Sequence, residues 1–141
     1  MQLVLRLSED DLNKLHAHAE QSLPLEAAAL LFGFAKDNDV VVSHIELVPN
    51  TAKSRTSFSV DPETEYRFLV EAEERGEDLV GIFHSHPAPP RPSSSDLRNM
   101  SLNPVVWVIS SKLTGNWASR AFILDEDNLE EVELDLKKLT S

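Results

Sequence analysis

The spacing of apolar residues changes several times along the chain, and each change predicts a different element. Residues 2–6 alternate weakly between apolar and polar side chains, which is typical of an edge strand. Ser8, three positions before Asp11, fits the N-cap of a helix that begins directly after it. The apolar positions of this helix predict a buried face made of Leu12, Leu15 and Ala19.

Further apolar or β-branched segments have the composition of strands. These segments are 25–34, 40–48, a short one at 58–60, 79–83, 105–110 and 117–124. The segment 25–34 fits a buried strand or a tightly packed turn that leads into one. Residues 129–136 alternate apolar with acidic side chains and fit either a last strand or a short helix.

Two more helices are expected. Asp61 and Pro62 are typical of a helix cap and first turn, and Gly76 ends that helix. Its apolar side is expected to consist of Tyr66, Leu69 and Val70. Residues 93–100 form the other helix, after a proline-rich segment that excludes regular structure. This order favours one α/β domain in which helices flank a mixed central sheet, without fixing the strand order.

Composition narrows the possible chemistry. A chain of 141 residues fits one domain, over residues 1–141, and 41% hydrophobic residues with 26% charged is ordinary globular composition. Cysteine is absent, so any metal must be held by imidazole and carboxylate groups. The formal charge of −11 argues against binding to nucleic acid or to an anionic membrane. Neither a signal peptide nor a membrane span is expected, which predicts a cytoplasmic protein.

Two histidines at the end of an apolar strand are the first chemical candidates. His84 and His86 stand two positions apart, and alternate strand residues face the same side, so both imidazoles can reach one point. Asp96, near the start of the next helix, can supply a carboxylate as a third ligand. Two histidines and an aspartate leave one position of a zinc ion open, as catalytic rather than structural zinc sites do.

Ordinary structural roles compete with this interpretation. A His-x-His pair on a strand is common and unspecific, and the other three histidines, His16, His18 and His44, are expected to be surface residues. Ser93 with Asp96 is also the pattern of a helix N-cap. The two interpretations of Asp96 are compatible, because a capped helix would hold the carboxylate rigidly.

Glu26 is a carboxylate inside the apolar segment 25–34, where a buried charge is costly unless it is paired. A salt bridge would satisfy it. Beside a metal-bound water, Glu26 would instead have the position of a general base that takes the water's proton and passes it to a leaving amine. The sequence leaves both possibilities open.

These residues together resemble the JAMM (MPN-plus) family of zinc isopeptidases. The motifs that carry the resemblance are Glu26 in PLEAAALLFG, the HSHP that begins at His84, and Ser93-x-x-Asp96. The stretches VPNTAKSRTSFSVDPET and LVGIFHSHP are also similar, so the resemblance covers residues 3–124. It implies a single MPN, cytidine-deaminase-like α/β domain. It also implies that His84, His86 and Asp96 bind one zinc ion, that Glu26 activates the water and that Ser93 helps to hold the oxyanion.

Two departures from the family's pattern are visible. The segment between His86 and Ser93 is one residue shorter than usual, which leaves Ser94 and Ser95 as alternatives for the hydroxyl role. The second departure is at positions 28 and 29, where two alanines replace the frequent Cys-Gly pair.

The family implies hydrolysis of the amide between the C-terminal diglycine of a ubiquitin-like protein and a lysine or another acceptor. The short chain resembles prokaryotic, archaeal members that remove small modifiers or process sulfur-carrier forms. The expected partners are ubiquitin-like or sulfur-carrier proteins and their conjugates, and a homodimer is a possible assembly. Residues 50–58 and 87–92 are expected to line the path of an extended substrate tail.

Three alternatives stay open. A JAMM peptidase could release an amino acid such as cysteine from a sulfur-carrier protein. A non-catalytic, metal-free MPN scaffold is a second alternative, against which the intact Glu26, His84, His86 and Asp96 argue. A branch of similar motif that is linked to DNA repair is the third, and the formal charge of −11 argues against it.

Overall fold

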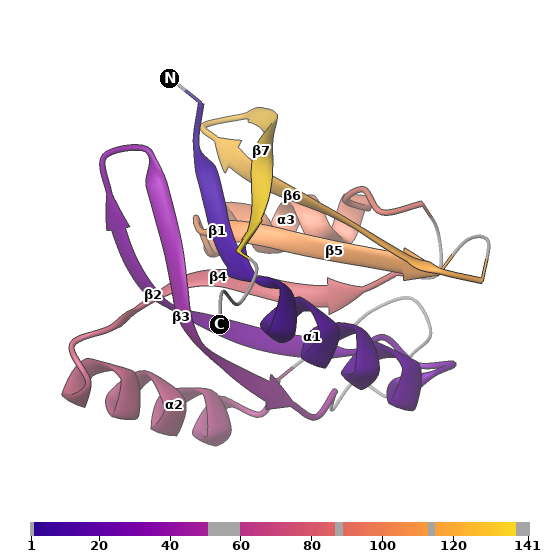
Figure 1. The fold of residues 1–141 in the computed structure, drawn as a ribbon, viewed down its shortest axis with the longest axis horizontal. Coiled ribbons are helices and arrows are strands. Elements are labelled where there is room, and N and C mark those ends of the chain that lie inside the picture. The colour runs from indigo at the N-terminus through magenta and orange to yellow at the C-terminus, as the bar shows by residue number, and fades with distance from the viewer. Residues whose placement is uncertain (1, 51–59, 87–88, 113–114, 138–141) are drawn as a thin grey trace.

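The computed structural model describes residues 2–50, 60–86, 89–112 and 115–137. Strands and helices alternate in the first two thirds of the chain, and three strands complete it (Figure 1). Their order is β1 (Val4–Ser8), α1 (Glu9–Ser22), β2 (Ala28–Lys36), β3 (Asp39–Val48), α2 (Pro62–Glu74), β4 (Asp78–Ser85), α3 (Ser94–Leu102), β5 (Val106–Lys112), β6 (Trp117–Asp125) and β7 (Asn128–Lys137). Residues 129–136 are therefore strand, while most of the short strand expected at 58–60 lies outside the described residues.

The strands close into a barrel in the order β1-β3-β2-β4-β5-β6-β7. Strand β1 runs parallel to both β3 and β7, and β4 runs parallel to β5, whereas the other neighbours are antiparallel. The expectation of a mixed α/β fold is thus confirmed, but the sheet closes on itself instead of staying open between flanking helices. The expected edge strand, β1, pairs on both sides. A closed sheet has no edge strand with unpaired backbone groups. The pattern of apolar residues along a sequence does not show whether a sheet closes.

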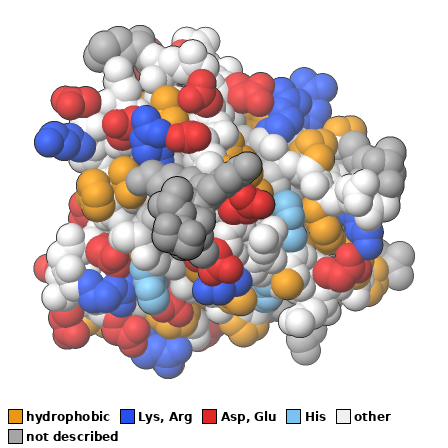
Figure 2. All heavy atoms as spheres, viewed as in Figure 1, with side chains coloured by type: hydrophobic (Ala, Val, Ile, Leu, Met, Phe, Trp, Pro, Cys, Tyr) orange, Lys and Arg blue, Asp and Glu red, His pale blue; other side chains and the backbone are white. Residues whose placement is uncertain are grey.

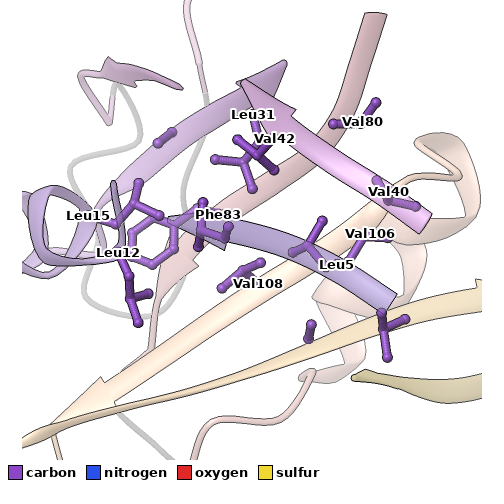
Figure 3. Packing of buried hydrophobic residues seen from close by; sticks show 14 of the residues in the cluster. Leu5, Leu12, Leu15, Leu31, Val40, Val42, Val80, Phe83, Val106 and Val108 are labelled. Atoms are coloured by element: carbon purple, nitrogen blue, oxygen red, sulfur yellow. The ribbon is translucent and has the colours of Figure 1, made fainter. Parts of the chain in front are cut away.

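Two apolar clusters lie on the two faces of the barrel wall. The inner cluster takes side chains from all seven strands and from α1, and Figure 3 shows Phe83, Leu31, Leu5 and Val108 pointing toward one another within it. The outer cluster lies on β2, β4, β5 and β6 and on the end of β3, and it includes residues of α2 and α3. Strand β2 contributes to both clusters, which explains why its sequence is almost continuously apolar rather than alternating.

Helix α2 packs through a different face from the one its sequence suggests. Ala72 is buried and Phe68 packs against the outer cluster. Tyr66 is 70% exposed, Leu69 is 36% exposed and Val70 is half-buried, so the apolar side expected from the sequence is not the side that packs on the barrel. The pair Phe68 and Ala72, four positions apart, occupies the narrow contact with the barrel, and Tyr66 points away from it.

The helix caps agree with the sequence. The Ser8 side chain accepts a hydrogen bond from the Asp11 backbone N–H, and Asp61 accepts one from Thr64. Leu12, Leu15 and Ala19 form the buried face of α1 as expected. None of the helices in the described part of the chain is both long and apolar enough to cross a membrane. On the face drawn in Figure 2, acidic and basic side chains lie interspersed.

Candidate active site

The carboxyl end of β4 brings both candidate histidines to one place. His84 is fully buried and lies opposite Ala28 of β2 and Ile109 of β5 in the sheet. His86 follows the last residue of the strand, and its backbone N–H donates to the Ser110 carbonyl at 2.8 Å. Pairing with neighbours on both sides therefore fixes the backbone that carries the two imidazoles.

Asp96 is held at the start of α3 by reciprocal hydrogen bonds with Ser93. The Asp96 backbone N–H donates to Ser93 Oγ at 3.2 Å, and the Ser93 N–H donates to Asp96 Oδ2 at 2.8 Å. This is a capping box, which satisfies two otherwise unpaired donors of the helix end. The helix-cap interpretation of these residues is confirmed, and the same bonds aim the buried Asp96 carboxylate at the histidines.

Four of the five candidate residues meet side chain to side chain. Asp96 Oδ1 lies 3.3 Å from His84 Nε2, and Asp96 Oδ2 lies 3.7 Å from His86 Nε2. On the other side of the ring, His84 Nδ1 lies 3.2 Å from Glu26 Oε1. Ser93 joins this cluster through its capping box with Asp96.

Glu26 lies in the segment between α1 and β2. Hydrogen bonds with Ser85 and Asn50 hold the backbone of this segment in place. The Ala27 N–H donates to Ser85 Oγ at 2.7 Å, and the Ser85 N–H donates back to the Ala27 carbonyl at 3.1 Å. Asn50 Nδ2 donates to the Glu26 carbonyl at 2.8 Å. Glu26 itself is only 2% exposed, and its Oε2 has no hydrogen-bond partner among the described residues.

Sequence reasoning assigned no role to Ser85 and placed Asn50 only at the start of the segment 50–58, which is expected to line the substrate path. Ser85 stands between the two histidines, so the strand alternation that directs them to one side directs Ser85 to the other, toward Ala27. Asn50 follows the proline that ends β3, where a side-chain amide often satisfies a neighbouring carbonyl. Both residues act on the backbone that carries Glu26.

The charges within the cluster are strongly coupled. Burial lowers the pKa of His84, but hydrogen bonds and charges from Asp96 and Glu26 outweigh it and raise the pKa to about 9. Burial raises the pKa of Asp96, but the contacts with His84 and Ser93 outweigh this and lower the pKa to about 2. In the absence of a metal, His84 and Asp96 are therefore an imidazolium and a carboxylate at neutral pH.

The contacts of His84 fit an imidazole that binds a metal ion. Its Nδ1 faces two acceptors, Glu26 Oε1 at 3.2 Å and the Ser85 carbonyl at 3.1 Å, so Nδ1 carries the hydrogen. Its Nε2 faces a third acceptor, Asp96 Oδ1, at 3.3 Å, and a proton or a cation between these two atoms would be favourable. The Nε2 proton of the metal-free imidazolium thus occupies the position that a cation would take.

The spacing of the donor atoms also fits zinc. Two ligand atoms on a tetrahedral zinc ion, each about 2.0–2.1 Å from it, lie about 3.3–3.4 Å apart. The His84–Asp96 separation of 3.3 Å agrees, and the His86–Asp96 separation of 3.7 Å is slightly longer. Among the described residues, no three His, Asp or Glu side chains are placed so that all three could bind one metal ion.

Two tryptophans border the cluster. The Trp107 ring meets that of His84 edge-on, with centroids 5.9 Å apart, and its Nε1 donates to the Asn103 carbonyl. Trp117, at the start of β6, helps to line a hollow of about 30 Å³ together with Glu26 and His86. One side of the cluster is therefore closed by a buried aromatic ring, and the other side opens into a small hollow.

The remaining three histidines lie outside this cluster, but they are not mere surface residues. His16 Nε2 lies 2.7 Å from Ser119 Oγ, and His18 Nε2 lies 3.0 Å from the Ala28 carbonyl. His44 contacts the carboxylate of Glu46. All three are half-buried, and burial lowers the pKa of His16. Each thus has a structural partner.

Comparisons with known proteins agree with the geometry. The family model described as prokaryotic homologs of the JAB domain matches residues 8–123. A desampylase of Pyrococcus furiosus is 39% identical over 115 residues, which cover 80% of this chain and 77% of that protein. A probable TtuB-protein conjugate cleaving protease of Thermus thermophilus is 29% identical over 126 residues, which cover 88% of this chain and 78% of that protein.

A solved structure supports the same relationship. The solution structure of a protein from Desulfitobacterium hafniense superposes with a TM-score of 0.83 at 30% identity and covers 96% of this chain and 94% of that one. The family match runs from the N-cap of α1 into β6 and contains every residue of the buried cluster. The chain therefore belongs to the prokaryotic JAB-domain family, within the JAMM group that its motifs resemble.

Proposed function

We propose that the chain is a zinc-dependent isopeptidase that removes ubiquitin-like proteins from their conjugates. The bond to be cleaved is the amide between the modifier's C-terminal diglycine and a lysine or another acceptor amine. The observation that carries the proposal is the buried contact of Asp96 with both His84 and His86, beside Glu26. The names of two relatives, a desampylase and a probable conjugate cleaving protease, support this substrate class.

His84, His86 and Asp96 are the residues that would hold the metal. A bound zinc ion would supply Lewis acidity, which makes water more acidic and the scissile carbonyl more electrophilic. The capping box keeps the Asp96 carboxylate in place, and the Ser85 carbonyl with Glu26 keeps the hydrogen of His84 on Nδ1.

Glu26 is suited to carry a proton between water and the leaving amine. Its Oε1 faces His84 Nδ1, whereas its buried Oε2 has no partner among the residues described and is available for a proton. As the water oxygen bonds to the carbonyl carbon, one water proton passes to Oε2. As the carbon–nitrogen bond breaks, Glu26 delivers that proton to the amine nitrogen.

Ser93 is suited to hold the oxygen that becomes negatively charged. Its Oγ accepts the Asp96 N–H and lies 3.2 Å from Ser95 Oγ, where either hydroxyl can donate, so the hydrogen of Ser93 is available for the oxyanion when Ser95 donates. Ser95 is half-buried and near enough to share this role, whereas Ser94 is exposed. The structure thus favours Ser93, with Ser95 as the second hydroxyl.

Removal of single ligands tests the proposed metal site. His86→Ala and Asp96→Ala are expected to lose zinc because each deletes one donor group, and elemental analysis of the purified variants measures the loss. Cleavage of a lysine-linked ubiquitin-like conjugate by the wild type should stop on addition of a chelator and return with zinc. Undiminished zinc in both variants would mean that the ligand set is wrong.

Other sequence-based expectations stay predictions. These are one domain over residues 1–141, residence in the cytoplasm and assembly as a homodimer. The expected substrate-lining residues lie mostly within 51–59 and 87–88, outside the described part of the chain.

A further inference from the structure

We infer that the small hollow beside Glu26 and His86 binds the aliphatic stem of the leaving amine, with the Trp117 indole as its fixed wall. The inference rests on the proposed isopeptidase function and adds to it a subsite on the acceptor side. The ligand class is a primary alkylamine in amide linkage, such as the side chain of a conjugated lysine.

The hollow combines reactive and apolar groups. It is lined by Glu26, Ser85 and His86 and by Leu23, Pro24, Leu25 and Trp117. Its volume is about 30 Å³, so it has room for a small group such as a methylene next to the reacting nitrogen. Leu23, which is 48% exposed, extends the apolar wall toward the solvent.

Helix α1 holds the Trp117 indole in a fixed orientation. The ring stacks on His16, with centroids 6.1 Å apart and an angle of 23° between the planes. The indole Nε1 donates to Glu20 Oε1 at 3.3 Å, and Lys112 Nζ binds the same oxygen at 2.6 Å. A ring that is already fixed loses little conformational freedom when an alkyl chain packs against it.

The position of the proton carrier assigns this hollow to the amine rather than to the acyl half of the substrate. A second, larger hollow of about 210 Å³ lies beside Ala28, Leu30 and Trp107 and extends to residues of α2 and α3. Glu26 lines the small hollow, and it is not among the described residues that line the large one. A substrate amide continues on both sides of the scissile bond, and Glu26 must reach the nitrogen, so the nitrogen side lies in the small hollow.

The chemistry of the wall suits both forms of the amine. Before cleavage, the methylenes next to the amide nitrogen are apolar, and burial of each methylene strengthens binding about fourfold. After cleavage, the product carries an ammonium group, which is attracted to the face of an indole ring. Contact with one or two methylenes would strengthen binding by roughly 4–15-fold.

Two substrates with the same acyl half test the subsite. One is a tail peptide ending in diglycine and linked to a lysine side chain, and the other is the same peptide as its primary amide, which has no carbon on the nitrogen. In Trp117→Ala and Leu23→Ala, we expect the KM of the lysine-linked substrate to rise, by roughly 4–15-fold for Trp117→Ala. The KM of the primary amide should change less than twofold, and Trp117→Phe, which keeps an apolar ring, should restore most of the loss. Equal changes for both substrates would overturn the subsite.

The control variant is Leu129→Ala. Leu129 is 43% exposed, similar to Leu23. It lies near the start of β7, next to the turn of the β6–β7 hairpin, whereas Trp117 lies at the opposite end of β6. It should leave both substrates unchanged. An effect as large as that of Leu23→Ala would show that the loss reflects general destabilisation, and would overturn the assignment.

A binding measurement separates this inference from the proposed function. Glu26→Gln, loaded with zinc, is titrated with the lysine-linked peptide, and the same titration is made with Glu26→Gln/Trp117→Ala. Roughly 4–15-fold weaker binding in the double variant supports the subsite, and an unchanged Kd overturns it. If the zinc-loaded wild type cleaved neither substrate, the proposed function would fail, and this titration would still decide the subsite.

Discussion

The residues of the site each use one atom for support and leave another for chemistry. His84 directs Nδ1 to Glu26 and the Ser85 carbonyl, and its Nε2 faces Asp96. Glu26 is held through Oε1 and its backbone, while Oε2 stays available. Supporting contacts of this kind orient metal ligands and keep their reactive atoms aimed at one point.

The His84–Asp96 pair predicts a pH-dependent stability of the metal-free protein. The pKa of His84 is raised from 6.5 to about 9, so its stabilising contribution is complete below about pH 6.5 and is lost as the pH rises through about 9. The pKa of Asp96 is lowered to about 2, so its own contribution is lost only in acid, below about pH 4. We expect the melting temperature of chelator-treated protein to fall between pH 6.5 and 9.

Asp96→Asn is the control for this pH dependence. It removes one of the two carboxylate charges that raise the pKa of His84, so the slope between pH 6.5 and 9 should become shallower. Circular dichroism melts of both proteins in chelator give the comparison. A wild type whose stability stays flat or rises over this range would contradict the charged pair.

At the residue scale, the sequence identified groups whose type alone is unusual for their surroundings. Glu26 in an apolar segment and His84 with His86 at a strand end stand out in this way. Asn50 and Ser85 do not, because they act by hydrogen bonds to a backbone that is distant in sequence. Apolar type was a poor guide on α2, where Tyr66 is exposed although the pattern assigned it to the buried face.

At the scale of elements, helix caps position the chemistry. Ser8 and Ser93 occupy equivalent N-cap positions of α1 and α3, and the hydroxyl of each accepts the N–H three residues later. Of these two serines, only Ser93 lies beside Asp96, which contacts His84. Ser8 therefore serves as a control that has the capping role without the proposed oxyanion role.

We expect Ser93→Ala and Ser8→Ala to lower the free energy of unfolding by similar amounts, about 1 kcal/mol each, because each removes one N-cap hydrogen bond. Ser93→Ala should also lower kcat by roughly 100-fold, since it removes a donor to the developing charge. Ser8→Ala should leave kcat unchanged. Denaturant titrations and steady-state kinetics measure the two effects, and equal kcat values in both variants would exclude the oxyanion role of Ser93.

Most helices and strands were predicted correctly because helix caps and apolar segments depend on residues that are close together in the sequence. The Asp61 cap and the strand after Gly115 were recognised in this way. The segment 25–34 proved to be a turn that leads into a strand, with Glu26 in the turn. The continuous apolar run of β2 predicts a buried strand, but it does not predict which strands pair with it. Pairing with β3 and β4 joins residues that are far apart in the sequence.

At the scale of the whole molecule, closure of the barrel places the site on a rigid wall. Strand β1 closes the barrel by pairing with β3 and β7, and Arg6 on β1 binds Asp39 of β3 and Asp135 of β7. Leu5, on the inner side of β1, is fully buried. Strand β4, which carries His84, is held within the same closed sheet.

Leu5→Ala should therefore destabilise the whole barrel. We expect it to lower the free energy of unfolding by about 2–5 kcal/mol, because it leaves a cavity where the core of a closed sheet can relax only partly. Leu129→Ala, at an exposed position, should change it by less than about 0.5 kcal/mol. Urea denaturation followed by circular dichroism measures both, and similar losses would contradict the central place of β1.

The closed topology lay beyond what the sequence pattern could predict. Leu5 and Leu7 of β1 are both fully buried, but weak alternation carries no information about strand neighbours. The expected edge position of β1 was wrong for that reason. The proximity of His84, His86 and Asp96 was easier to predict than the topology, since it follows from the spacing within β4 and from the α3 cap.

The most direct test of the proposed mechanism is to measure zinc content and turnover together in Glu26→Gln. This change removes the proposed proton carrier but none of the three proposed ligands, His84, His86 and Asp96. The variant should keep the same zinc content as the wild type while cleavage of a lysine-linked ubiquitin-like conjugate falls by about 100-fold or more. A folded, zinc-loaded Glu26→Gln protein that cleaves at the wild-type rate would contradict the role of Glu26 and the mechanism built on it.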